Sequence, residues 1–258
     1  MIKQILIQNK VLFWLGAIHF IIFFVLLIHA PFNEELILGV NSVIKPMKFA
    51  LSIWIYSWTM ALILHYIEDT GKVKVYSWVA VITMCFEQFA ITSQALRGQL
   101  SHFNKTDFYG ILLFSLMGVL ILTITLWTAY MTYIFIKQKK YVLSPVVVLS
   151  VKIGLIYFVV FSLFGGYISS KTGHTVGTAD GGEGLWFMNW SRFFGDLRVA
   201  HFFGIHSLQL IPLLGIFADK YLPNSLRLKS MWLVSILYLF FVLGVMIQGM
   251  MGLPFVKF

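Results

Sequence analysis

One segment of the chain combines an apolar composition with side chains that could do chemistry. Residues 195–214 read GDLRVAHFFGIHSLQLIPLL and carry Asp196, Arg198, His201, His206 and Gln209. At about 100° per residue, Arg198 and Gln209 lie within roughly 20° of each other on a helix. The two histidines fall about 60° and about 80° to either side. Because ionisable groups in hydrocarbon usually face a bundle interior or a wet cavity, we predict that this helix lines a buried polar site.

Four histidines could act as metal ligands at such a site, namely His102, His174, His201 and His206, and Asp180 or Asp196 could add a carboxylate. The spacing of His201 and His206 puts their rings about 140° apart, so they cannot chelate one ion from a regular helix but could flank a ligand between helices. A haem b would take axial histidines from two helices, with Lys48, Arg97 or Arg198 for its propionates. The pattern favours a membrane enzyme that depends on a divalent metal or haem.

Two other functions fit the same residues. Glu87 precedes Arg97 by ten residues, about 15 Å along a helix, and should therefore lie near mid-membrane. An acidic side chain at that depth is paired, protonated or functional. It could carry the proton in a proton-coupled transporter of a small anion, with the Lys and Arg side chains as the anion site. The other alternative is a non-catalytic sensor or assembly factor that docks a partner through a long loop.

The composition fixes the broad class of the protein. Of the 258 residues, 59% are hydrophobic and 11% are charged, whereas soluble domains carry about 25% charged residues. The chain is therefore expected to be an integral membrane protein with the lipid bilayer as a partner. Its single cysteine, Cys85, excludes disulfides and cysteine-rich metal sites within one chain. The net charge of +9 comes mostly from basic residues at the ends of apolar runs, which is typical of membrane anchoring and not of nucleic-acid binding.

Apolar runs long enough to span a membrane, at about 20 residues per crossing, fall near 11–30, 47–66, 76–96, 110–135, 143–164, 197–217 and 231–251. We predict an all-α bundle of seven transmembrane helices in a single transmembrane domain, 1–258. A glycine-rich loop at about 165–196 would lie over the site. Of the 19 Lys and Arg residues, ten lie at the N-terminus and in even-numbered loops and eight on the other side. This excess favours a cytoplasmic N-terminus and an outside C-terminus, and we expect an inner-membrane protein.

With seven crossings, the first, third and fifth loops face the same side, and the unusual polar residues gather at their borders. We predict catalytic roles for Glu87, Arg97, Arg198 and His206. We predict ligand binding by Lys45, Lys48, Gln94, Asp180, Asp196 and Gln209. The ligand would be a small molecule or an anion.

Four stretches in this order are IKPMKFALS, RGQLSHFN, HTVGTADGG and GDLRVAHFFGIHSLQLIPL. Together they cover roughly residues 41–215, and here the chain resembles a group of uncharacterised bacterial multi-pass membrane proteins. The resemblance implies a membrane protein with one coherent site, and it carries no reaction or cofactor across.

Overall fold

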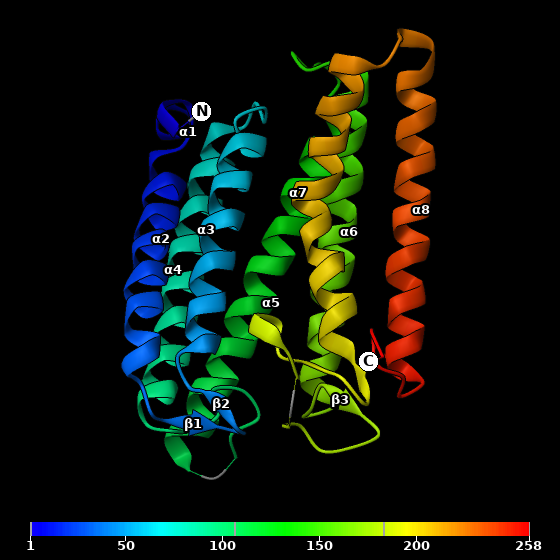
Figure 1. Ribbon diagram of the computed structural model, residues 1–258. Helices are drawn as coiled ribbons and strands as arrows, with labels where there is room; N and C mark the ends of the chain where they lie inside the picture. Colours follow the sequence, from blue (N-terminus) through cyan, green and yellow to red (C-terminus); the bar gives the residue numbers. More distant parts are fainter. Residues whose placement is uncertain (1, 106, 183, 258) are drawn as a thin grey trace. The chain divides into compact units, whose positions relative to one another are not determined.

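The computed structural model describes residues 2–105, 107–182 and 184–257. Its long helices are α2 (Lys10–His29), α3 (Ile44–Leu64), α4 (Thr70–Leu96), α5 (Phe108–Lys137), α6 (Pro145–Ser170), α7 (Leu197–Tyr221) and α8 (Asn224–Met250), drawn in Figure 1. Seven spans in the described chain are long and apolar enough to cross a membrane, and the first of them runs on to Phe32. The predicted all-α fold with seven membrane-spanning helices is confirmed.

Short elements that the sequence pattern did not predict fill the connections. A seven-residue helix, α1 (Ile2–Gln8), precedes α2, and a 3-10 turn, η1 (Ala30–Phe32), ends it. The strands β1 (Leu36–Ile37) and β2 (Val40–Asn41) form a hairpin before α3. Between α6 and α7, β3 (Thr175–Val176) pairs with β6 (Gly195–Asp196), and β4 (Gly184–Leu185) pairs with β5 (Trp190–Ser191) around the 3-10 turn η2 (Trp186–Met188).

The contacts divide the chain into two compact units, Met1–Trp127 and Thr128–Phe258. The first, called the N-terminal unit below, holds α1 to α4 and most of α5. The second, the C-terminal unit, holds the end of α5 together with α6, α7 and α8. One transmembrane domain over the whole chain stays a prediction.

Aromatic and polar contacts join the helices of the N-terminal unit. Phe13 on α2 stacks on Trp58 of α3 with ring centroids 5.6 Å apart, and the Trp58 indole donates to the Phe13 carbonyl at 3.1 Å. A Cβ at Gly16 would lie 2.4 Å from Cδ1 of Trp58, so this glycine allows the close approach of the two helices. The hydroxyls of Tyr56 and Tyr76 bond α3 to α4.

Small residues join α6 to α7 in the C-terminal unit. The Ser207 hydroxyl lies 3.2 Å from the Gly154 carbonyl, and a Cβ at Gly154 would lie 3.0 Å from the Pro212 ring. Gly165 and Gly166 stay helical, so α6 ends at Ser170, six residues later than the apolar run predicts. On the other side of α7, the Tyr238 hydroxyl of α8 donates to the Phe203 carbonyl at 2.5 Å.

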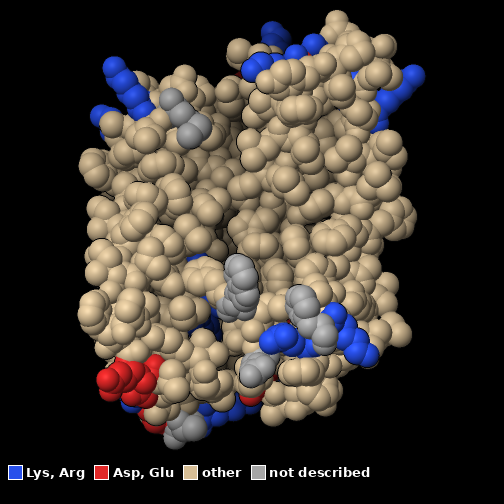
Figure 2. Space-filling model, viewed as in Figure 1, with Lys and Arg blue, Asp and Glu red and all other residues tan. Residues whose placement is uncertain are grey.

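The outer surface of both units is apolar along the helices. Val119, Leu213 and Phe240 are each more than half exposed. On the face shown in Figure 2, charged side chains gather mainly at helix ends, and the surface between them consists almost entirely of other residue types. Such a surface is stable against lipid and costly against water.

Candidate functional sites

A buried carboxyl lies on α4 in the N-terminal unit. The Glu87 side chain is 1% exposed, and its Oε1 atom has no hydrogen-bond partner. The next turn of α4 carries Ala90 and Ile91, which pack in an apolar cluster with Met117 of α5. The charge that acts on Glu87 is that of Lys45, at the start of α3. A carboxyl in this position keeps the capacity to bind a proton or a further polar group.

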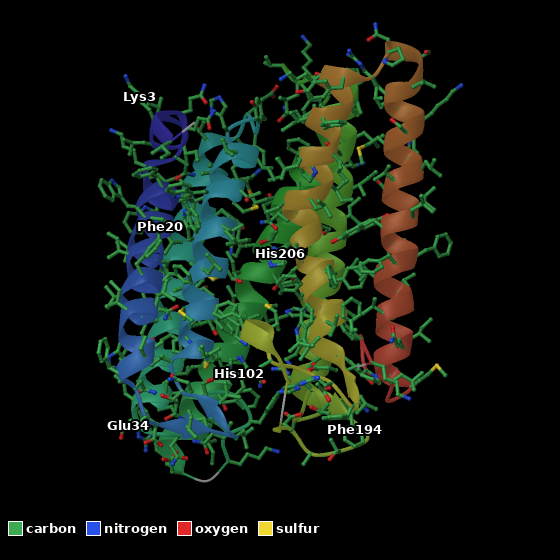
Figure 3. The ribbon with its side chains drawn as sticks, in the orientation of Figure 1. Lys3, Phe20, Glu34, His102, Phe194 and His206 are labelled. Carbon is green, nitrogen blue, oxygen red and sulfur yellow. The ribbon has the colours of Figure 1, made fainter. Side chains whose placement is uncertain are left out.

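Lys45 also contacts His102, which follows α4. Its Nζ atom lies 3.2 Å from Nδ1 of His102, and the Ser101 hydroxyl lies 3.3 Å from the same nitrogen. The rings of Phe49 and Phe114 lie about 6 Å from the His102 ring. His102 lies toward the same end of this unit as Glu34, and Lys3 lies at the opposite end (Figure 3). Lys45 thus links two other predicted residues, Glu87 and His102. The contacts of Lys48, three residues after Lys45, do not define a role.

Arg97 is neutralised by an acidic residue that the sequence analysis did not single out. Its guanidinium contacts the Asp107 carboxylate at 2.6 Å and lies 4.6 Å from the centroid of the Tyr109 ring. It also donates to Gln94 Oε1 at 2.8 Å, and Gln94 donates to the Leu100 carbonyl. The Gly110 N–H and the Arg97 guanidinium hold the pKa of the Asp107 carboxyl below its ordinary value. Arg97 and Gln94 therefore fix the turn between α4 and α5.

Asp196 organises the loop of the C-terminal unit. It is the N-cap of α7 and accepts from the Arg198 N–H at 3.0 Å. It also accepts from the Ser191 N–H and pairs with the Arg198 guanidinium at 2.6 Å. Burial alone would raise the pKa of the Asp196 carboxyl, but Arg198, His174 and the Ser191 N–H together hold it below its ordinary value. The same guanidinium donates to the Asn189 carbonyl at 2.5 Å.

His174 and Asp180 complete this network. The Asp180 carboxylate accepts the N–H groups of His174 and Thr175, at 3.0 and 2.8 Å. Nδ1 of His174 lies 3.4 Å from Asp180 and 3.6 Å from Asp196. The Leu197 N–H bonds to the His174 carbonyl at 2.9 Å. Ion pairs and backbone hydrogen bonds thus connect the described part of the loop to the start of α7. Asp180, Asp196 and His174 each contact other groups of this network.

The remaining polar residues of α7 bond to different protein groups. His201 bonds through Nδ1 to the Phe161 carbonyl of α6 at 2.8 Å, and a Cβ at Gly165 would lie 2.6 Å from its ring. Nδ1 of His206 lies 3.2 Å from the Gln209 amide oxygen. His206 lies well along the length of α7, away from Phe194 at the loop end (Figure 3). Both histidines of α7 are therefore in contact with protein groups.

The predicted metal site of His102, His174, His201 and His206 finds no support. Within the described ranges, no group of three or more His, Cys, Asp or Glu side chains could hold a metal ion. Each histidine nitrogen described above already faces a protein partner. Haem b binding stays a prediction.

Comparison with known proteins does not assign the chain to a family. No protein-family model, no curated protein and no solved structure matches the chain. The resemblance to bacterial multi-pass membrane proteins stays an expectation, and function has to be inferred from the sites themselves.

Proposed function

We propose that the protein is a proton-coupled carrier of a small monovalent anion in a bacterial inner membrane. The observation that carries this proposal is Glu87, a carboxyl buried within a membrane-spanning helix, with an unbonded oxygen and with Lys45 as the acting charge. Acidic groups at this depth typically mark proton and ion pathways.

Charge balance at Lys45 would couple the binding of an anion to the binding of a proton. An ammonium in a low-dielectric site is stabilised by a negative group nearby, so the site around Lys45 favours an anionic partner. In the proposed cycle, the anionic form of Glu87 would be that partner in the empty carrier. When an anion takes its place, Glu87 becomes an uncompensated carboxylate and binds a proton. Each anion would therefore move together with one proton, and the cycle would carry no net charge.

The orientation of the chain in the membrane would set the direction of transport. With a cytoplasmic N-terminus, three crossings place the segment after α4 outside, so His102 would lie on the outer side of Glu87. The bonded pair of His102 and Lys45 would then stand between the external medium and the carboxyl. Protons and anions would enter from outside, down the proton gradient.

Reconstituted vesicles test this function. The purified chain is placed in liposomes that contain a pH-sensitive dye, and inward gradients of chloride, nitrate or dihydrogen phosphate are applied in turn. We expect at least one anion to acidify the interior, at a rate independent of an imposed membrane potential. Glu87→Gln should abolish this acidification. Glu34→Gln, a change at an acidic residue before the β1–β2 hairpin, should leave it at the wild-type rate.

Acidification in the Glu87→Gln variant at the wild-type rate would contradict the proposal. Flux that follows the membrane potential would contradict the charge balance.

A further inference from the structure

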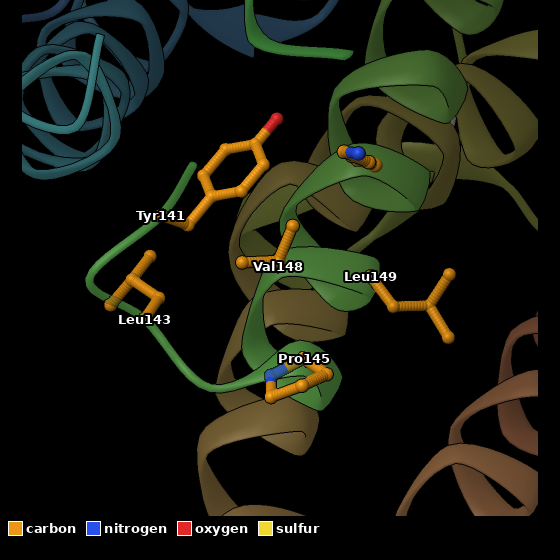
Figure 4. Close-up of a pocket in the computed structure, with 6 residues that line it drawn as sticks. Tyr141, Leu143, Pro145, Val148 and Leu149 are labelled. Atoms are coloured by element: carbon orange, nitrogen blue, oxygen red, sulfur yellow. The ribbon is translucent and has the colours of Figure 1, made fainter. Parts of the chain in front are cut away.

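A pocket of about 360 Å³ lies beside the start of α6 in the C-terminal unit. It is lined by Tyr141, Leu143, Pro145, Val148, Leu149 and Lys152. Tyr141 and Leu143 come from the connection between α5 and α6, and the other residues come from the first two turns of α6 (Figure 4). One cationic side chain is thus combined with walls that are mostly apolar.

Tyr141 is held in place as one wall of this pocket. Its hydroxyl donates to the Phe135 carbonyl, and the rings of Phe135 and Tyr141 lie 5.1 Å apart. Because Phe135 is fully buried, this contact anchors the connection to α5. The Tyr141 wall of the pocket is therefore held in place by its contacts with α5.

The charge of Lys152 is incompletely satisfied within the described chain. Its Nζ atom lies 3.5 Å from the Ile136 carbonyl and 5.0 Å from the centroid of the Tyr141 ring, and among the described residues it has no carboxylate partner. These are weak contacts for an ammonium group, since a charge-assisted bond is normally shorter than 3 Å. The Lys152 side chain can accept a better anionic partner without losing an ion pair.

The sequence around the pocket carries several lysines and no acidic residues that could neutralise them. Residues 108–179 contain no Asp or Glu, while the connection carries Lys137, Lys139 and Lys140, all exposed. Near the end of α7, Asp219 is already paired with Arg227 of α8 at 2.8 Å. Clusters of Lys and Arg next to a membrane-spanning helix attract anionic lipid headgroups by about 1 kcal/mol for each charge.

We propose that this pocket binds one anionic phospholipid. Lys152 would contact the lipid phosphate, and Val148 and Leu149 would contact the first part of an acyl chain. Lys152 follows the first residue of α6 by seven positions, about 10 Å along the helix. The headgroup region takes about 5–7 Å on each side of a bilayer, and the long lysine stem can span the remaining distance to a lipid phosphate. A soluble anion would leave the apolar walls of the pocket exposed to water, whereas a phospholipid satisfies both the cation and the walls.

Native mass spectrometry of the detergent-purified full chain tests the site. Wild type is titrated with phosphatidylglycerol and, separately, with phosphatidylcholine, and we expect a preference for one molecule of the anionic lipid. Lys152→Gln should weaken phosphatidylglycerol binding about fivefold, the equivalent of about 1 kcal/mol. Lys152→Arg should restore it to within about twofold, because the charge is kept. Lys229→Gln removes the same charge from an exposed position on α8 and serves as the matched control.

Equal weakening in Lys152→Gln and Lys229→Gln would overturn the proposal, because only the total charge would then matter. Wild-type affinity in Lys152→Gln would overturn it as well. Leu149→Trp gives an independent reading, since a larger side chain should fill the pocket and lower binding while Lys152 stays. Competition by inorganic phosphate alone, at equal affinity, would assign the pocket to a soluble anion and overturn the lipid assignment.

Discussion

Nζ of Lys45 lies 3.2 Å from Nδ1 of His102, although 57 positions separate them in the chain. A lysine ammonium can only donate, so Nδ1 of His102 accepts and its ring carries the proton on Nε2 while Lys45 is charged. The contact joins the start of α3 to the segment after α4, beside the helix that carries Glu87. It places a neutral imidazole next to the charge that acts on the buried carboxyl.

Replacement of Lys45 by methionine should lower anion-driven proton uptake about tenfold or more. The change removes the charge that the anion and Glu87 share, and loss of one charged contact of this kind corresponds to about 1.5–3 kcal/mol. The rate of dye acidification in vesicles measures it. Lys3→Met, at the opposite end of the unit, is the control and should behave as wild type. Equal rates for the two variants would remove Lys45 from the anion site.

Arg97→Gln should leave anion-driven proton uptake within about twofold of wild type and the melting temperature nearly unchanged. Its partner Asp107 already neutralises the guanidinium, and both side chains are about two-fifths exposed, so the pair contributes little. The sequence pattern alone predicts a catalytic Arg97, and a complete loss of uptake in this variant would favour that role over the structural one.

Acid should loosen the loop of the C-terminal unit through Asp196. The pKa of this carboxyl is lower in the folded protein than its ordinary value of about 3.9. Its stabilising contribution is therefore complete above the ordinary pKa and is lost as the pH falls through the lower, folded value. Limited proteolysis of the 171–196 segment at decreasing pH measures the loss. Asp196→Asn should be less stable at neutral pH, because asparagine keeps the cap of α7 but loses the charge that pairs with Arg198. It should also be less sensitive to acid.

Gly165→Ala should destabilise the protein by about 1–3 kcal/mol, while Gly166→Ala should not. A Cβ at Gly165 would lie 2.6 Å from the His201 ring, which its bond to Phe161 holds in place, whereas a Cβ at Gly166 meets nothing within 4 Å. Thermal unfolding in one detergent compares the two variants. The double variant Gly165→Ala/His201→Ala should recover part of the loss. Identical melting temperatures for the two alanine variants would contradict the tight contact of α6 and α7.

The helices could be predicted from the sequence because a membrane span needs only length and apolarity. The cap of α7 was predictable too, since an aspartate directly before a helical run satisfies its first N–H groups. The short strand pairs were not, because two-residue strands depend on partners such as Thr175 and Asp196 that lie far apart in the chain.

The sequence can suggest candidate site residues, but it cannot show their contacts. A helical wheel places Arg198, His201 and His206 on one broad face. It cannot show that Arg198 bonds to Asn189, His201 to Phe161 and His206 to Gln209. Asp107 follows a short loop without any periodic pattern, so no sequence signal linked it to Arg97. Glu87 was identified correctly as buried, because an acidic residue in the middle of an apolar run almost always faces the bundle interior and not the lipid.

The most direct test of the central claim is the protonation of Glu87 itself. Infrared difference spectroscopy of the purified protein in liposomes, at fixed pH, follows the carbonyl band of a protonated carboxyl as the transported anion is added. The band should grow on anion addition in wild type and be absent from the Glu87→Gln difference spectrum. An anion-dependent band of equal size in Glu87→Gln, or no change in wild type on addition of an anion that it transports, would contradict proton binding by Glu87 as the coupling step.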